Sequence, residues 1–193
     1  VTPRKLEQAF KQLSSVAMTE GSRKLVFKSL ASKWREFTNP IPVLNYQPFV
    51  RPTYVSITHG DFNQYNLLVD REGYTWMIDF QSTGPSHILR DVAELESIVR
   101  LQLLDPDRAS LDERLHLEER LNQPKRFSQI ADLPPHITVG NEHIEKAYAV
   151  TLHLRKLARQ MVIKNPSDDI SEYYVALLYN ALNMVRFIDL ALV

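Results

Sequence analysis

The chain contains no cysteine among its 193 residues, which excludes disulfides, thiolate metal sites and a cysteine nucleophile. Its glycines are few and too far apart to form a glycine-rich phosphate-binding loop: Gly21, Gly60, Gly73, Gly84 and Gly140. Lysine and arginine number 23, as do aspartate and glutamate, so no overall charge attracts the chain to nucleic acid or to an anionic membrane. No apolar run approaches the roughly 18 residues of a membrane span, and the N-terminus lacks the apolar core of a signal peptide. We therefore expect a cytoplasmic protein that binds neither nucleic acid nor a membrane.

The length of the chain predicts a single domain, because domains commonly run to about 100–200 residues. We expect a helical opening at residues 1–38, a proline-rich connector at 39–53, a central core at 54–105 and a helical remainder at 106–193. This order of helices, a small β element and more helices predicts a mostly helical α+β fold.

Apolar residues at helical spacing are the evidence for these helices. In the opening they are Leu6, Phe10, Leu13 and Val16, followed by Leu25, Leu30, Trp34 and Phe37. The next segment holds residues that forbid helix and favour an extended connector: Pro40, Pro42, Pro48 and Pro52. After a loop at 82–85 and a second at 122–140, the same spacing predicts helices at about 87–104, 111–121, 142–164 and 167–192.

Two short segments in the central core read as strands. Residues 54–58 form one candidate, and residues 67–78 read as a hairpin around a four-residue turn, Asp70 to Gly73. Such a turn sets Val69 opposite Tyr74. Asn66 would then lie opposite Met77 and within a residue or two of Asp79.

Oxygen-bearing side chains gather at the open end of this predicted hairpin. Asn66 and Asp79 flank its strands, and Asp61 lies in the loop that leads into it. Carboxylate and amide oxygens suit Mg²⁺, which takes one or two carboxylates together with substrate phosphates. Such a set is typical of phosphoryl transfer, in which the protein mostly positions groups and neutralises charge.

The stretch His59-Gly60-Asp61, with Asn66 five residues later and Ile78-Asp79-Phe80 beyond it, resembles the active-site core of the aminoglycoside phosphotransferase and choline kinase-like family. The resemblance covers about residues 59–95. It implies the C-terminal lobe of a protein kinase-like fold, in which a small β-hairpin carries the catalytic and metal-binding loops. It also implies that Asp61 is the catalytic base, that Asn66 and Asp79 bind the metal, and that His59 and Asp91 support the catalytic loop.

The activity that the resemblance implies is transfer of the γ-phosphoryl group of ATP or GTP to the hydroxyl of a small molecule, with Mg²⁺ as cofactor. Asn63 stands where protein-directed relatives carry a lysine, which argues against a protein substrate. Gln81 stands where some relatives carry a second metal-binding carboxylate. Loose candidates for meeting a cationic acceptor are Glu94, Glu96, Glu118 and Glu119.

The resemblance leaves alternatives open, because the residues before His59 do not read as the nucleotide-binding lobe of such enzymes. That lobe, or further domains, would lie upstream of Val1, and no nucleotide-binding residue can be named. The chain would otherwise be a degenerate kinase-fold module that binds or regulates within a larger protein, without catalysis. A metal-dependent phosphoesterase is a third, weaker hypothesis.

Overall fold

A computed structural model describes residues 24–28, 34–39, 53–137, 140–162 and 167–184. The chain divides into two compact units, one made of Val1–Pro52 with Ala181–Val193 and the other of Thr53–Asn180. The prediction of one domain stays a prediction. The predicted helices before residue 24, and most of the proline-rich connector, lie outside the described residues.

The described part of the first unit contains a β-hairpin where helix was predicted. Strand β1, Lys24–Lys28, pairs antiparallel with β2, Trp34–Thr38. The helical prediction is therefore wrong at these residues. Lys-Leu-Val-Phe-Lys and Trp-Arg-Glu-Phe-Thr contain the aromatic and β-branched residues Val26, Phe27, Trp34, Phe37 and Thr38, and this residue content, which favours strands, outweighs the helical spacing. An ion pair between Lys24 and Glu36 joins the two strands.

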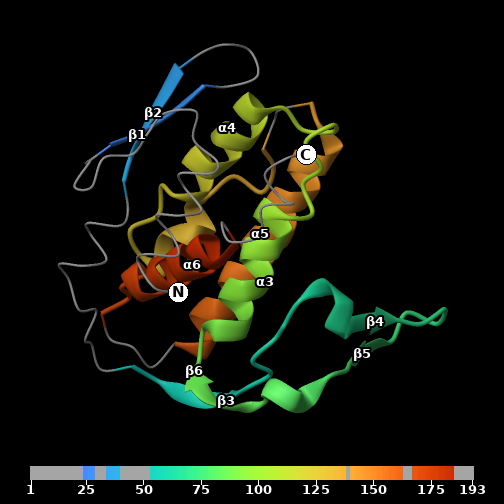
Figure 1. The fold of residues 1–193 in the computed structure, drawn as a ribbon. Coiled ribbons are helices and arrows are strands. Elements are labelled where there is room, and N and C mark those ends of the chain that lie inside the picture. Colours follow the sequence, from blue (N-terminus) through green and yellow to red (C-terminus); the bar gives the residue numbers. More distant parts are fainter. Residues whose placement is uncertain (1–23, 29–33, 40–52, 138–139, 163–166, 185–193) are drawn as a thin grey trace. The chain divides into compact units, whose positions relative to one another are not determined.

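The second unit is built mainly from helices (Figure 1). They are α3 (Arg90–Leu101), α4 (Leu111–Leu121), α5 (Glu142–Met161) and α6 (Ser171–Met184), with the 3₁₀ helix η3 (Phe127–Asp132) between α4 and α5. With the short antiparallel strands, they confirm the predicted α+β class. The sequence also marks two helix starts: Ser110 forms a capping box with Glu113, and the Asn141 side chain caps the first turn of α5.

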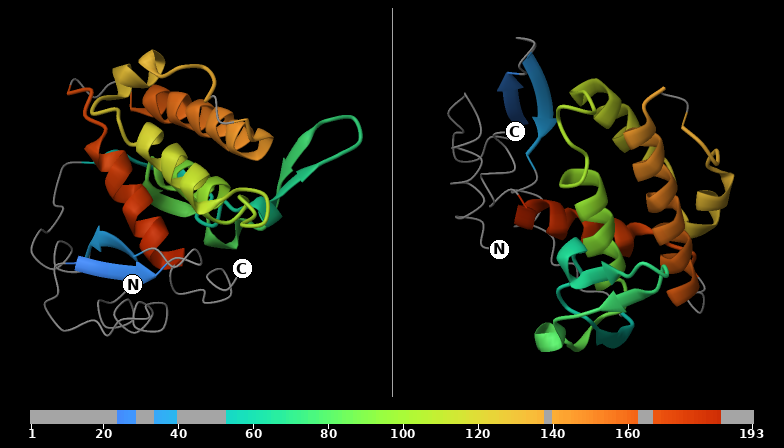
Figure 2. Two further views of the ribbon diagram at one scale, coloured as in Figure 1. Left: turned by 90° about the horizontal axis from the view of Figure 1, so that it is seen from above. Right: turned by 90° about the vertical axis from the view of Figure 1, so that its right-hand side faces the viewer.

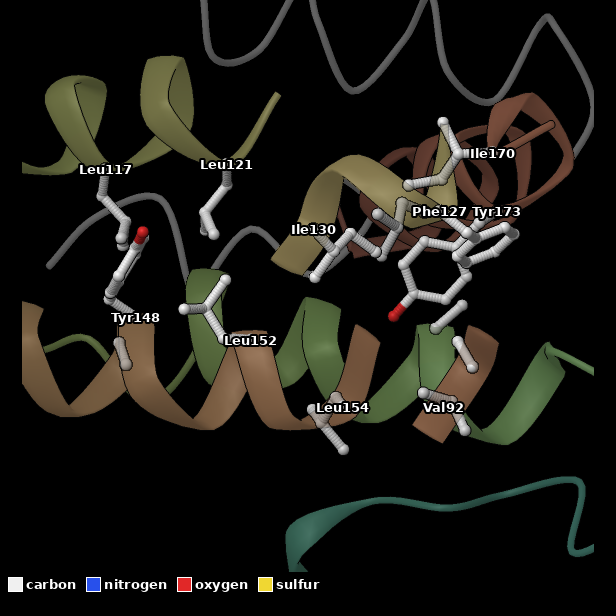
Figure 3. Close-up of a cluster of buried hydrophobic side chains, with 14 of the residues drawn as sticks. Val92, Leu117, Leu121, Phe127, Ile130, Tyr148, Leu152, Leu154, Ile170 and Tyr173 are labelled. Atoms are coloured by element: carbon white, nitrogen blue, oxygen red, sulfur yellow. The ribbon is translucent and has the colours of Figure 1, made fainter. Parts of the chain in front are cut away.

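The core of the second unit lies between these helices. Figure 3 shows Leu117 and Leu121 of α4 facing Tyr148 and Leu152 of α5, with Ile130 of η3 beside them. All five side chains are at most 5% exposed. Burial of apolar surface on this scale, at about 25 cal/mol per Å², supplies the main force that holds the helices together.

A buried ion pair joins α3 to α5 within this core. Arg155 and Glu96 are both 0% exposed, and the Arg155 guanidinium donates to both carboxylate oxygens at 2.7–3.2 Å. The Tyr173 hydroxyl donates to the same carboxylate at 2.7 Å, and Arg100 bridges Glu96 to Glu118. Glu96 is therefore structural and inaccessible to a cationic acceptor, whereas the role suggested for Glu118 stays a prediction.

Two pairs of short strands lie on the N-terminal side of α3. Strand β3, Val55–Thr58, pairs antiparallel with β6, Gly84–His87. Strand β4, Leu67–Val69, pairs antiparallel with β5, Thr75–Met77. The predicted loop at 82–85 is therefore partly strand, because its pairing with β3 comes from a segment about 30 residues away. No helix among the described residues is both long and apolar enough to cross a membrane.

Candidate functional site

The loop that follows β3 is held by the start of helix α3. The backbone N–H groups of His59 and Gly60 both donate to the Asp91 carboxylate, at 2.7 and 3.0 Å. Strand β3 delivers the loop and its partner β6 leads into α3, so the pairing of these strands brings Asp91 to His59. In addition, the Arg90 guanidinium donates to the carbonyl oxygen of Gly60.

Gly60 is required at its position in this loop. Its φ angle of +84° lies in the region that L side chains rarely adopt, and a Cβ atom there would lie 2.2 Å from the carbonyl oxygen of Ser82. The tight turn lets His59 reach back to the residue before Asp79. The His59 side chain is 7% exposed, and its Nε2 donates to the Ile78 carbonyl oxygen at 2.9 Å.

His59 is placed to hold the loop rather than to exchange protons with a ligand. Because a carbonyl can only accept, the Nε2 atom carries a proton in this hydrogen bond. Nδ1 is buried without a hydrogen-bond partner. The ring packs between Phe62 and Phe80, with centroid distances of 5.7 and 5.1 Å.

Two amide side chains orient the carboxylate of Asp61. Asn63 Nδ2 donates to Asp61 Oδ1 at 3.0 Å, and Asn66 Nδ2 donates to Asp61 Oδ2 at 3.2 Å. Asn66 Nδ2 also donates to the Asp61 backbone carbonyl at 2.8 Å. Since the nitrogen of the Asn66 amide is engaged in this way, its oxygen is the atom available to a cation.

Asp79 lies beside this pair because of the hairpin register. The Ile78 N–H donates to the Asn66 carbonyl at 3.1 Å, so Asp79 follows directly after the residue opposite Asn66. The predicted register is wrong by one residue, since Val69 pairs with Thr75 and Leu67 with Met77. Asp70 faces Tyr74 across the turn, because the Asp70 N–H donates to the Tyr74 carbonyl at 3.0 Å.

The backbone of Asp79 is unusual for an aspartate. Its φ and ψ of 62° and 64° are left-handed, and its side chain makes no capping hydrogen bond. Left-handed non-glycine residues carry a conformational cost and cluster at functional sites, where the surrounding structure maintains them. Here the bonds that Ile78 makes to Asn66 and His59 maintain the conformation.

A further carboxylate, Glu94, borders the site from α3. It accepts the Phe62 N–H at 3.3 Å. Partial burial raises the pKa of Glu94, and the negative charge of Asp61 adds to this effect. Glu94 was predicted only as a loose candidate for meeting a cationic acceptor, and its contact with the loop was not foreseen. Its place one helical turn after Asp91 is the signal that predicts the shared face.

The donor set is poor in carboxylates for an unaided metal site. Within the described ranges, no group of three or more histidine, cysteine, aspartate or glutamate side chains is arranged to hold a metal ion. Asp61, Asp79 and the Asn66 amide oxygen give two carboxylates and one neutral oxygen. That set fits Mg²⁺ only if water and the phosphate oxygens of a ligand complete its shell.

A family model described as ternary complex associated domain 9 matches residues 34–185, which is most of the chain. No curated protein and no solved structure matches.

The family match corrects the interpretation of the central motif. The chain was expected to resemble the aminoglycoside phosphotransferase and choline kinase-like family, and the matching model is a different one. The kinase, phosphotransferase and ATP-binding descriptions that followed from that resemblance are therefore wrong as a classification. The motif that carried the resemblance consists of only five residues in one loop and one hairpin. The family model also spans the helices, so it rests on much more of the chain.

Proposed function

Because this chain belongs to the ternary complex associated domain 9 family, we propose that it is a binding module of a multi-protein assembly, in which the loop at 59–66 and Asp79 bind Mg²⁺ together with a phosphorylated ligand. The family description supports association with other proteins. The chemistry of the site supports the cation and the phosphate. The proposal contains no catalytic step.

One observation carries the cation proposal. The Asn66 amide turns its nitrogen to Asp61, and the backbone of Asn66 pairs with the residue before Asp79. Three oxygen-bearing groups from two segments are thereby held around one end of the hairpin. A site whose donors are already ordered loses less entropy on binding than one that must form them.

The proposal that the ligand carries a phosphate follows from the same three oxygen-bearing groups. Mg²⁺ is bound in proteins through one or two carboxylates plus phosphates of a ligand, and it keeps several waters. The carboxylates of Asp61, Asp79 and Glu94 would repel a bare phosphate. The ligand would therefore arrive with the cation and not alone.

Phosphoryl transfer from ATP or GTP to a small-molecule hydroxyl, with Asp61 as base, stays a prediction. It was implied by a resemblance that the family match overturns, so it is not part of this proposal. The assignment of Asp61, Asn66 and Asp79 to a Mg²⁺ site is part of the proposal, whereas a cytoplasmic location stays a prediction.

Calorimetric titration of the 193-residue chain with Mg²⁺ and pyrophosphate tests the proposal. We expect pyrophosphate to bind only when Mg²⁺ is present, and Asp79→Asn to weaken that binding at least tenfold. Asp132→Asn is the matched control, because Asp132 is exposed and lies in η3, outside the site. Pyrophosphate binding without Mg²⁺, or equal affinity in Asp79→Asn and the parent, would contradict the proposal.

A second readout locates the ion. Mn²⁺ accepts the same oxygen ligands as Mg²⁺ and broadens the NMR signals of nearby nuclei. We expect broadening of the Asn66 side-chain amide and of the Asp79 backbone amide at low Mn²⁺ concentration. Broadening confined to exposed carboxylates elsewhere would place the ion at a different site.

A further inference from the structure

The hairpin of β4 and β5 exposes an unusual amount of apolar surface. Among the described residues, eleven of the nineteen large apolar side chains that are exposed lie between Tyr54 and Phe80, and five of these belong to the hairpin: Leu68, Val69, Tyr74, Trp76 and Met77. Trp76 is 59% exposed, Met77 51% and Val69 69%. Exposed apolar residues that occur singly are ordinary, but a concentration of this kind marks an interaction site.

Both faces of the hairpin contribute to this surface. Leu68 pairs with Trp76 and Leu67 with Met77, and successive residues of a strand point to opposite faces. Leu68 and Trp76 therefore share one face, and Val69 and Met77 lie on the other. Figures 1 and 2 show the hairpin extending away from helices α3 to α6.

The outer edges of the hairpin are also available. Within the described ranges, β4 pairs only with β5, and no third strand joins them. A two-stranded hairpin in water is marginally stable, and an additional strand stabilises it through main-chain hydrogen bonds. The shape of the surface thus suits an extended segment.

The charge of the surrounding segment selects the kind of partner. Residues 53–89 carry four carboxylates (Asp61, Asp70, Glu72 and Asp79) and one guanidinium (Arg71), a formal charge of −3. Two such surfaces repel each other, which disfavours pairing with a second copy of this chain. Nucleic acid and anionic lipid are repelled for the same reason.

We infer that the β4–β5 hairpin docks an extended segment of a different protein, one in which aliphatic side chains alternate with lysine or arginine. The aliphatic side chains cover the face of Val69 and Met77, and the lysine or arginine side chains lie over the opposite face, where they meet the ring of Trp76 and the carboxylate of Asp70. The Trp76 indole N–H donates to Asp70 Oδ2 at 2.9 Å, which orients the ring before binding. The inference rests on the proposed role in a multi-protein assembly, and because it shares Asp61 and Asp79 with the proposed cation site, its test is made without Mg²⁺.

Two labelled eight-residue peptides test the inference, one alternating valine with lysine and the other valine with glutamate. Binding to the 193-residue chain is followed by fluorescence anisotropy in the presence of EDTA, so that failure of the cation site leaves the result unaffected. We expect the lysine peptide to bind at least tenfold more tightly than the glutamate peptide. We also expect its affinity to fall as salt rises.

Matched variants separate docking on the hairpin from general attraction to an acidic protein. Val69→Gln and Met77→Gln should each weaken the binding of the lysine peptide at least fivefold. Val150→Gln and Met161→Gln, which change exposed residues of the same types in α5, should leave it unchanged. Equal binding of both peptides, equal effects of the four variants, or no binding at all would overturn the inference. A dimer in light scattering that Met77→Gln dissociates would also overturn it, because the occupant would then be a second copy.

Discussion

The carboxylate of Asp91 accepts the backbone N–H of Gly60 at 3.0 Å, across 31 positions of sequence. It also accepts the N–H of His59, so one side chain at the start of α3 sets the path of the loop that holds Asp61. The candidate site therefore depends on the docking of this loop to the helix, and the first prediction concerns that carboxylate.

Asp91→Asn should lower the free energy of unfolding by about 1.5–3 kcal/mol, the usual contribution of a hydrogen bond to a charged group. The new amide keeps one acceptor oxygen, but its NH₂ group faces a backbone donor. Urea denaturation of the full chain measures the change, with Asp132→Asn as the control. A loss no larger than that of the control would show that Asp91 does not hold the loop.

Gly60 and Gly73 form a matched pair for substitution by alanine. Both have positive φ, +84° and +89°, but a Cβ atom at Gly73 would meet nothing within 4 Å, whereas at Gly60 it would lie 2.2 Å from Ser82. Gly73→Ala should cost about 1–2 kcal/mol for the left-handed backbone alone. Gly60→Ala should lower the stability by clearly more than this, because the new Cβ atom also clashes with Ser82. Thermal unfolding of both variants measures the difference. Equal costs would mean that the Ser82 carbonyl moves aside freely.

Glu96→Gln should destabilise the core at neutral pH, because it leaves the buried guanidinium of Arg155 without a charged partner. Breaking a buried pair in this way typically costs about 3–5 kcal/mol. Burial alone would raise the pKa of Glu96, but attraction to Arg155 and the bonds from Arg155 and Tyr173 outweigh it and lower the pKa below its ordinary value of 4.5.

The pH dependence of this variant follows from that direction. The stability due to ionised Glu96 is present above pH 4.5 and is lost as pH falls through the lowered pKa of the folded chain. The difference between parent and Glu96→Gln should therefore shrink in acid below pH 4.5. Denaturant unfolding at a series of pH values measures it. A constant difference down to pH 3 would contradict the assigned direction.

Asp70 should control the order of the hairpin loop. Its carboxylate accepts the Trp76 indole N–H and the Tyr74 backbone N–H, at 2.9 and 2.8 Å. The hydrogen bond from Trp76, together with those from the loop backbone, lowers the pKa of Asp70 below its ordinary value of 3.8. The order of the loop should thus persist above pH 3.8 and be lost as pH falls through this lowered pKa.

An NMR titration of the Trp76 indole N–H measures this effect, and its midpoint should lie below pH 3.8. Asp70→Ala should speed amide hydrogen exchange at Tyr74 and leave exchange in α5 unchanged. A midpoint above 3.8, or unchanged exchange at Tyr74, would count against the proposed hydrogen bonds.

The amino-acid sequence alone determined the helical part and the composition of the site. Helix α4 begins and ends at the predicted residues 111 and 121, because apolar spacing and the capping residues are local signals. The hairpin at 67–78 was predicted, one residue out of register, since a hairpin relates nearby residues of the chain, and the assignment of Asp61, Asn66 and Asp79 to one site stays a prediction. The hairpin at 24–38 was missed because five-residue strands carry a weak pattern that a helix can also satisfy.

Only the tertiary structure decided the relationships between distant segments. The pairing of β3 with β6, the bonds of Asp91 to the 59–60 backbone and the burial of Glu96 against Arg155 each join residues about 30 or more positions apart. Periodicity and spacing report only on residues that are close along the chain, so they cannot predict contacts between segments that are far apart in the sequence. The one-residue error in the β4–β5 register has a local origin: Asp70 faces Tyr74 across the turn through a hydrogen bond, and a one-residue slip exchanges the two faces of a strand.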